Sequence, residues 1–207
     1  MLFRSQPTPT AFPPWTLPAI PPFGDLDGEG VWSPYLTDPA GKVVAVRTFL
    51  QTDPERPYAL VGIVAFDLRH TELHFVLGSE EPSLPDGPRG TGRIPERDLQ
   101  PGRLLATFNG GFLATHGEYG AMADGLVALP AKPGYGTLTI EPNGALNLGA
   151  WAETIDPQGT YRSWRQNARM VIENGAINER VNNGSILTWG GSINGEVVTW
   201  QIGRAHV

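Results

Sequence analysis

TLTIEPNGALNL, residues 137–148, holds two short alternating segments on either side of a Pro-Asn-Gly turn. In residues 137–140 and 145–148 every second side chain is a large apolar one, as in a half-buried β-strand. Asn143-Gly144 favours the positive φ angles that a type I′ turn needs at both of its central residues. The stretch therefore predicts an antiparallel β-hairpin.

Strand and turn signals of the same kind recur along the chain. Asn174-Gly175 and Asn194-Gly195 predict two further hairpins, with strands at 170–172 and 176–178, and at 190–193 and 197–200. Upstream, apolar and β-branched runs separated by turn residues predict an antiparallel meander over 43–50, 60–67 and 73–77. Proline and glycine crowd residues 79–103, which predicts a long surface loop with a helical turn near 96–99.

Composition narrows the class of protein. Glycine and proline number 26 and 20 among 207 residues, which favours turns and short strands over a helical bundle. The net charge of −6 provides no basic field, so we expect no nucleic-acid partner. The chain has no cysteine, which excludes disulfides and thiol chemistry. We predict an α+β fold that is predominantly β in this fragment, with an antiparallel or mixed sheet and with helices mostly in a missing C-terminal part.

The N-terminal segment differs in amino-acid composition from the rest of the chain. Prolines recur between residues 7 and 22, so residues 1–27 are predicted to form an extended linker. No apolar run is long enough to span a bilayer, and no signal peptide opens at Met1. Either the protein stays inside the cell or its true N-terminus is missing. We expect the second, with a membrane tether upstream of the linker and an extracellular or cell-envelope location.

One of the five Asn-Gly pairs departs from the hairpin pattern. Asn109-Gly110-Gly111 follows a fully apolar run at 104–108, which predicts a buried central strand. Phe108 and Phe112 bracket the turn and are expected to anchor both of its ends in the core. Bare backbone at the end of a buried strand lets a ligand approach closely, and the Asn109 amide offers a donor and an acceptor. The alternative is an ordinary turn.

Polar residues at 165–167 form a second candidate group. On a strand, Arg165 and Asn167 share one face while Trp164 and Gln166 share the other. Arginine suits a phosphate, and amides suit sugar hydroxyls. The alternative is a solvated edge strand.

The remaining candidate groups are one carboxylate and three imidazoles. Asp124 precedes Gly125, and its carboxylate is placed either to stabilise charge at an anomeric carbon or simply to form a turn. His70, His74 and His116 lack metal-ligand spacing, so we predict neither a metal site nor a cofactor.

These motifs, taken in order, resemble the phosphodiester glycosidase family, which includes the mannose-6-phosphate uncovering enzyme. The resemblance covers residues 28–201. It rests on Gly28–Trp32, Phe108–Phe112, Gly120–Gly125, residues 137–144, Gly149-Ala150-Trp151, residues 164–167, Asn174-Gly175 and Trp189-Gly190.

The resemblance implies hydrolysis of a sugar-1-phosphodiester, with a glycan or sugar phosphate as substrate. It implies catalytic roles for Asn109 and Asp124. It further implies substrate-binding roles for Gly110, Gly111, Arg165, Gln166 and Asn167.

The C-terminal end departs from the family pattern. The family continues with helices and a late Asp-containing motif, and neither is present here. Residues 202–207, IGRAHV, look like the translation of a sequencing adapter. We expect residues 28–201 to be an incomplete domain and residues 202–207, with His206, to be a non-native tail.

Two other interpretations of the function compete with a hydrolase. Because fold does not fix function, the domain also fits a non-catalytic carbohydrate-binding or cell-envelope module. A purely structural β-domain in a surface assembly is the third reading. The oligomeric state stays open.

Overall fold

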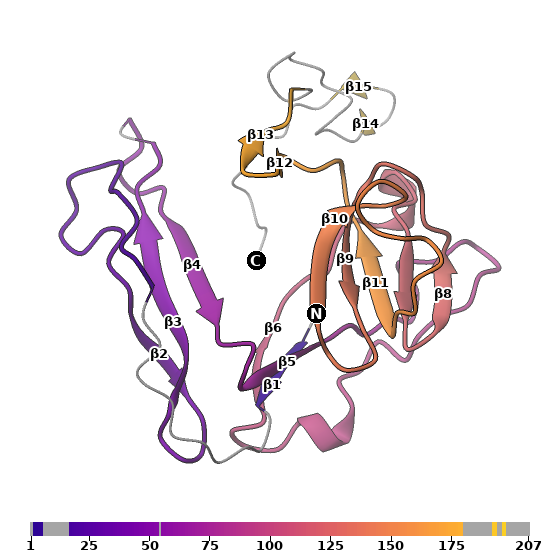
Figure 1. The fold of residues 1–207 in the computed structure, drawn as a ribbon, viewed down its shortest axis with the longest axis horizontal. Helices are drawn as coiled ribbons and strands as arrows, with labels where there is room; N and C mark the ends of the chain where they lie inside the picture. The colour runs from indigo at the N-terminus through magenta and orange to yellow at the C-terminus, as the bar shows by residue number, and fades with distance from the viewer. Residues whose placement is uncertain (1, 6–16, 54, 180–191, 194–195, 198–207) are drawn as a thin grey trace. The chain divides into compact units, whose positions relative to one another are not determined.

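The structure, a computed structural model, describes residues 2–5, 17–53, 55–179, 192–193 and 196–197 (Figure 1). Contacts divide the chain into two compact units. The N-terminal unit comprises Leu2–Leu73 and Pro95–Thr107, and the C-terminal unit comprises His74–Ile94 and the chain from Phe108 onward. Residues 202–207, predicted to be a non-native tail, lie outside the described residues.

The N-terminal unit contains an antiparallel three-stranded sheet, a second three-stranded sheet and a single-turn helix. One sheet has the order β2-β3-β4, with β2 at Ser33–Thr37, β3 at Val43–Leu50 and β4 at Val61–Phe66. The other has the order β5-β1-β6, with β1 at Leu2–Ser5, β5 at Thr71–His74 and β6 at Leu104–Thr107. The 3-10 helix η1 spans Glu96–Asp98, which confirms the predicted turn in an otherwise irregular loop.

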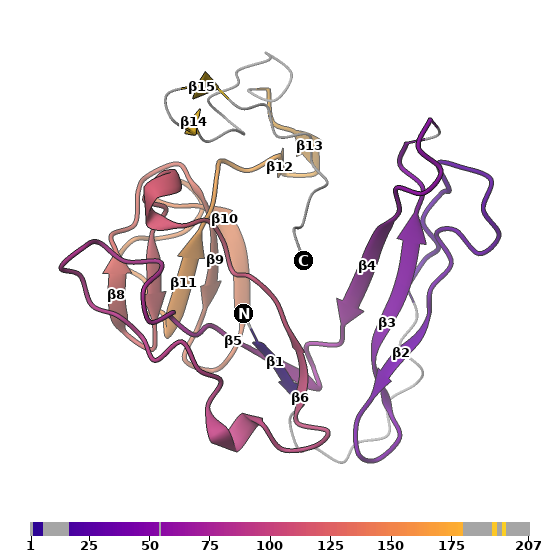
Figure 2. The ribbon, with the colours of Figure 1, turned by 180° about the vertical axis from the view of Figure 1, so that it is seen from behind.

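The C-terminal unit is built on a five-stranded antiparallel sheet, seen from both sides in Figures 1 and 2. Its order is β10-β9-β11-β7-β8, formed by Leu146–Ala150, Gly136–Ile140, Ser163–Gln166, Ala121–Ala123 and Leu126–Leu129. The 3-10 helix η2 spans Ala114–His116. Two small hairpins follow, β12 at Ile172–Glu173 with β13 at Ala176–Ile177, and β14 at Ser192–Ile193 with β15 at Glu196–Val197.

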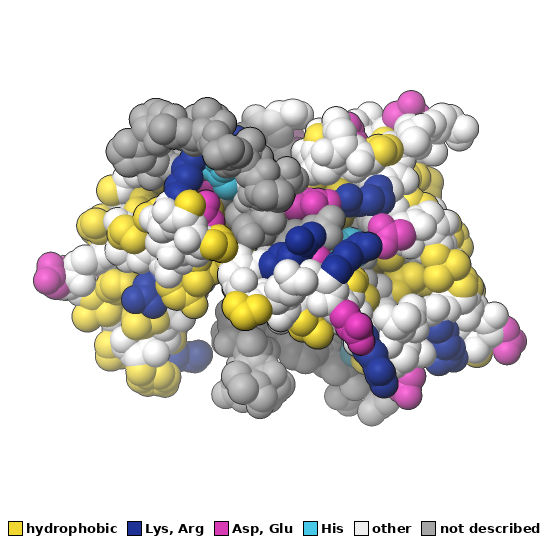
Figure 3. All heavy atoms as spheres, turned by 90° about the horizontal axis from the view of Figure 1, so that it is seen from below, with side chains coloured by type: hydrophobic (Ala, Val, Ile, Leu, Met, Phe, Trp, Pro, Cys, Tyr) yellow, Lys and Arg dark blue, Asp and Glu magenta, His cyan; other side chains and the backbone are white. Residues whose placement is uncertain are grey.

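The described residues are therefore mostly β, with antiparallel sheets, as the sequence predicts. The two 3-10 turns are the helices whose bounds are described, and no helix among the described residues is long and apolar enough to cross a membrane. The predicted C-terminal helices concern sequence beyond residue 207 and stay a prediction. Acidic and basic side chains are interspersed on the face shown in Figure 3.

The hairpin at residues 137–148 is confirmed, but its turn type differs from the prediction. Strands β9 and β10 pair from Ile140↔Leu146 onward, and in the turn only Gly144 has a positive φ, of 89°. Pro142 explains this, because its ring fixes φ near −65° and so favours a type I turn followed by a left-handed glycine. At Asn174-Gly175 both residues have positive φ, 51° and 76°, as the type I′ prediction requires. The turn at 194–195 lies outside the described residues.

Two predicted strand environments are wrong. The third strand of the expected meander, β5, leaves the β2-β3-β4 sheet and pairs elsewhere after a tight turn in which the Asp67 carbonyl accepts from the amides of His70 and Thr71. The apolar run before Asn109 forms β6, which is a half-buried edge strand and not a buried central one. The central place in that sheet belongs to β1, from a segment expected to be linker. Leu2–Ser5 precede the first proline, so nothing in their sequence opposes a strand.

One buried carboxylate helps to attach residues 17–32 to the rest of the N-terminal unit, beside the bond from the Gly30 amide to the Phe49 carbonyl. Glu29 Oε1 accepts from the amides of Phe23 and Gln51, and Oε2 accepts from that of Gly24, over 2.8–3.0 Å. Close packing requires glycine at position 30, since a Cβ atom there would lie 1.9 Å from the Ile20 carbonyl oxygen. The C-terminal part of the predicted linker is thus folded onto the unit.

These hydrogen bonds make the attachment dependent on pH. Burial by itself raises the pKa of the Glu29 carboxyl, but the three backbone N–H donors outweigh it and hold the pKa below its ordinary value of 4.5. A depressed carboxyl pKa contributes stability that is present above pH 4.5 and is lost as the pH falls through the folded-state pKa.

We expect Glu29→Gln to lower the thermal midpoint at pH 7 and to weaken the loss of stability between pH 5 and pH 3. The neutral amide accepts more weakly and does not titrate in this range. Thermal unfolding followed by circular dichroism across this range measures both effects. Glu55→Gln, at an exposed position, is the matched control. An identical pH profile for Glu29→Gln and the unaltered protein would contradict the assignment.

Candidate functional site

The turn at Asn109-Gly110-Gly111 belongs to the C-terminal unit. Asn109 Oδ1 accepts from the Gly111 amide at 3.2 Å, and Asn109 is exposed. Asn143 makes the same kind of bond with the Ala145 amide at 2.9 Å. The local hydrogen bond is therefore that of an ordinary asparagine turn, as the alternative predicts. What distinguishes the turn at Asn109 is the group beneath it.

Gly111 rests directly on Arg165 and Asn167. A Cβ atom at Gly111 would lie 2.8 Å from Nε and Nη2 of Arg165 and 2.9 Å from Oδ1 of Asn167. Its φ of 154° is also one that side chains rarely allow. Both the lack of space for a Cβ atom and the φ angle therefore require glycine at position 111. The shared contact also confirms that Arg165 and Asn167 point to one side of the chain.

Arg165 is a buried residue of β11, which lies between β9 and β7 in the sheet. The predicted alternative of a solvated edge strand is therefore wrong. Nη1 donates to the carbonyls of Tyr119 at 2.6 Å and Gly120 at 3.1 Å, and Nη2 donates to that of Phe112. The guanidinium thus joins the turn to the segment that leads into β7.

The charge of Arg165 survives its burial. Burial lowers the pKa of the guanidinium to about 10, and the nearby Glu81 carboxylate opposes this shift. The group is consequently protonated at neutral pH. Glu81 is itself tied to the same region, because its Oε2 accepts from the Ala114 amide at 2.7 Å. A positive charge therefore lies in a low-dielectric environment under bare backbone.

Gln166 lies on the other face of β11 and is fully buried. Its Oε1 accepts from the amides of Gly120 at 3.2 Å and Lys132 at 2.8 Å. Its Nε2 donates to the Lys132 carbonyl at 3.0 Å and to Thr137 Oγ1 at 2.9 Å. These four bonds use the whole capacity of the amide. Gln166 can position the site, whereas the role of contacting substrate belongs to groups with exposed surface.

Asp124 forms the two-residue turn between β7 and β8 with Gly125, at φ angles of 48° and 81°. This is the turn-forming role that the sequence left open for it. Its amide donates to Ser163 Oγ at 3.0 Å, and its Oδ2 lies 2.9 Å from Nε2 of His74. The carboxylate is 56% exposed, while the imidazole is 6% exposed. A buried imidazole thus orients an exposed carboxylate.

The predicted site residues fall into two groups at opposite ends of β7. The turn, Arg165 and Asn167 adjoin Gly120, and Asp124 follows the last residue of the strand. At about 3.3 Å per residue, roughly 13 Å separates the Cα atoms of Gly120 and Asp124. A substrate that contacts both groups must extend along β7.

The expected aromatic anchors of the turn are wrong. Phe108 and Phe112 are 47% and 45% exposed, so neither lies in the core. Phe112 contacts the ring of Tyr119 with centroids 5.7 Å apart. The floor of the turn is the charged Arg165, and this polar support leaves the two phenylalanines at the surface.

His74 is the residue that the sequence did not single out. It contacts Asp124 across 50 positions of sequence, and no local spacing reveals such a pair. Its position in an alternating run was the only signal available. Within the described residues, no three His, Cys, Asp or Glu side chains gather as a metal centre requires.

Comparison of the chain with protein-family models, curated proteins and solved structures finds no match. The resemblance to phosphodiester glycosidases stays a prediction from the sequence.

We expect Gly111→Ala to destabilise the protein by about 3 kcal/mol or more, because the new methyl group displaces a buried charged side chain. Gly175→Ala is the matched control. It has a positive φ of 76° but open space around it, so backbone strain alone costs about 1–2 kcal/mol. Free energies of unfolding from urea titration measure both. Equal losses for the two variants would show that Arg165 does not support the turn.

Proposed function

We propose that this protein is a phosphodiester glycosidase that hydrolyses a sugar-1-phosphodiester. The observation that carries the proposal is the Asn109-Gly110-Gly111 turn, exposed at Asn109 and half-buried at its two glycines, which lies on the buried, protonated Arg165. The exposed amide of Asn167 flanks the same position.

Electrostatics favour an anion with a single charge above this turn. The guanidinium lies where the effective dielectric constant is low, so its attraction for an anion is stronger than in water. Glu81 offsets part of that charge, which disfavours a highly charged ligand. A phosphodiester carries one negative charge. Because Oδ1 of Asn109 is taken by the Gly111 amide, Asn109 would meet the phosphate through its Nδ2 donor.

The proposed reaction breaks the bond between C1 of the sugar and the phosphate oxygen. Water forms a bond to C1, the bonding pair goes to the phosphate oxygen, and the water proton leaves to solvent. The products are the free sugar and a phosphomonoester. The leaving group is a stable anion, so oriented donors around the phosphate contribute more than a strong acid would.

A phosphate held at the turn is bonded directly to C1, so Asp124, whose Cα atom lies roughly 13 Å from that of Gly120, would contact a sugar hydroxyl remote from C1. His74 would hold that carboxylate in one orientation, since it contacts Oδ2 from a buried position. The proposal therefore places the phosphate at the turn and the sugar ring toward the Asp124 end of β7.

We expect the full chain to convert a sugar-1-(p-nitrophenyl phosphate) diester to sugar and p-nitrophenyl phosphate. A phosphatase added afterwards releases p-nitrophenol from that product. Asn109→Ala should lower kcat by about 10²–10³-fold through loss of a donor to the developing charge. Asn143→Ala is the control, because it removes an asparagine with the same local bond from a turn outside the site.

The position of bond cleavage is part of this test. Release of p-nitrophenol before phosphatase is added would mean that a P–O bond breaks, and the glycosidase proposal would fail. Equal kcat for Asn109→Ala and Asn143→Ala would remove Asn109 from the reaction. Absence of turnover together with measurable glycan binding would favour the non-catalytic carbohydrate-binding module.

Asp124→Asn should raise KM about tenfold with little change in thermal midpoint, because a charged acceptor for a sugar hydroxyl is lost. Asparagine tolerates the left-handed conformation of residue 124, so the turn is preserved while the charge is lost. Steady-state kinetics measure the effect, with the exposed Asp156→Asn as control. An unaltered KM would show that Asp124 only forms the turn.

A further inference from the structure

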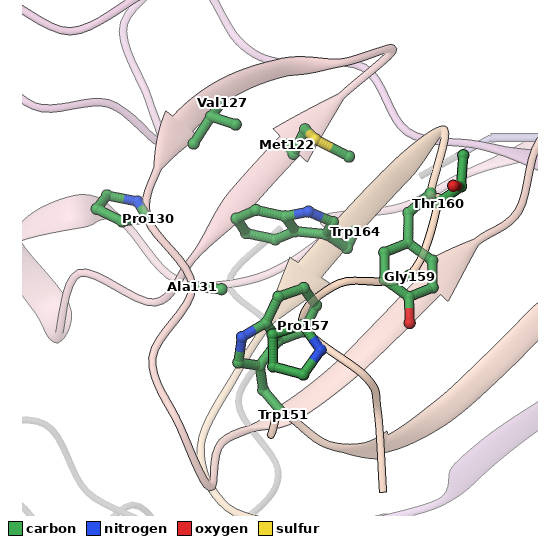
Figure 4. Close-up of a pocket in the computed structure, with 10 residues that line it drawn as sticks. Met122, Val127, Pro130, Ala131, Trp151, Pro157, Gly159, Thr160 and Trp164 are labelled. Carbon is green, nitrogen blue, oxygen red and sulfur yellow. The ribbon is translucent and has the colours of Figure 1, made fainter. Parts of the chain in front are cut away.

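A pocket of about 620 Å³ opens on the face of the sheet that carries the Trp164 side chain (Figure 4). Neighbouring residues of a strand point to opposite faces, so this pocket and the contact of Arg165 with Gly111 lie on opposite sides of β11. The volume is within the range of roughly 300–1,000 Å³ that is typical of small-molecule sites. The proposed hydrolysis makes no use of it.

Three aromatic rings in fixed positions form the walls of the pocket. Trp151 and Trp164 are both nearly buried, with ring centroids 5.4 Å apart, and Tyr161 lies 5.9 Å from Trp151. In Figure 4 the Trp164 ring lies between Met122 and Trp151. The Tyr161 hydroxyl donates to the Asp156 carbonyl at 2.8 Å, which fixes that ring. Gly159 leaves room for it, because a Cβ atom there would lie 2.3 Å from the hydroxyl oxygen.

The polar groups of the pocket are neutral. No charged side chain is among the described residues that line it. In the described part of the chain, the indole N–H groups of Trp151 and Trp164 have no hydrogen-bond acceptor. Neither indole nitrogen is among the fully buried polar atoms that lack a partner. Thr160 adds an exposed hydroxyl. The pocket therefore combines aromatic faces with uncharged hydrogen-bonding groups.

This combination discriminates among ligand classes. A charged ligand would lose hydration here without gaining a partner of opposite charge. A wholly apolar ligand would leave the indole donors and the threonine hydroxyl without partners. A saccharide ring has an apolar face of C–H groups for the aromatic walls and hydroxyl oxygens for the donors, so it satisfies both.

We propose that this pocket binds a neutral saccharide ring. The site is separate from the proposed catalytic site, and its ligand needs neither a phosphate nor Asn109. Saccharide binding here would hold a longer glycan on the protein whether or not the protein hydrolyses it.

The test is a fluorescence titration of the full chain with maltose, cellobiose and N,N′-diacetylchitobiose, none of which carries a phosphate. Trp151 and Trp164 line the pocket, so we expect a saturable change in tryptophan emission with at least one of them. Val127→Phe, which fills the pocket from β8, should raise Kd at least tenfold. Leu126→Phe is the matched control, because Leu126 is 42% exposed, Val127 is 43% exposed, and only Val127 lines the pocket.

A second variant tests the pocket even if Val127→Phe fails to fold. Thr160→Val keeps the shape of an exposed lining side chain and removes its hydroxyl, and it should raise Kd about threefold or more with an unchanged thermal midpoint. No saturable change with any of the three disaccharides would overturn the proposal. So would Kd values that Val127→Phe and Leu126→Phe alter equally.

One further variant separates this proposal from the proposed hydrolysis. Asn109→Ala should leave disaccharide binding unchanged even where it abolishes turnover. If Asn109→Ala removes binding and Val127→Phe does not, the saccharide occupies the turn and the pocket proposal fails, while the catalytic site gains support.

Discussion

The hydrogen bonds from the Arg165 guanidinium hold the candidate site together. The carbonyls of Phe112, Tyr119 and Gly120 come from two separate stretches of irregular chain, and one planar cation donates hydrogen bonds to all three. A lysine has the same charge but lacks the rigid fork of donors that reaches two segments at once. Without this cation the carbonyls would need other donors and Gly111 would lose its floor. The start of β7, and with it the position of Asp124, depends on the same contact.

Strand β11 supplies both functional faces of the C-terminal unit. It is only four residues long, yet all four side chains are buried, because β9 and β7 flank it and both faces of the sheet are covered. On one face Arg165 supports the turn at Gly111, and on the other face Trp164 lines the aromatic pocket. Changes within β11 would disturb both sites together, so the loops and β8 are the places where each site can be altered alone.

Local turn chemistry made the hairpins predictable from the sequence, since an Asn-Gly pair between alternating segments encodes its own pairing. Even there, Pro142 selected a different turn type through its fixed φ. The common orientation of Arg165 and Asn167 was equally accessible, because strand periodicity alone determines it.

Other features depend on which distant segments meet. The apolar run that forms β6 was predicted to be a central strand, but the central strand of that sheet is β1, at Leu2–Ser5. The contact of His74 with Asp124, like the pocket formed by four separate stretches, leaves no periodic trace in the sequence. Gln166 was predicted to contact substrate because an amide suits sugar hydroxyls. The amides that it bonds instead are far away in sequence, so the sequence does not reveal them.

The two bonds between the Gln166 amide and Lys132 reproduce the pairing of one peptide unit with another. A carboxamide offers a C=O and an N–H side by side, and here each meets its complement on the same backbone residue. The side chain thus joins the irregular segment at Lys132 to the end of β11 as a backbone pair would. Glutamate has the same length but would direct an oxygen at the Lys132 carbonyl, and asparagine would fall short. The local structure at this end of β11 is therefore encoded in a single side chain, which backbone propensities do not reveal.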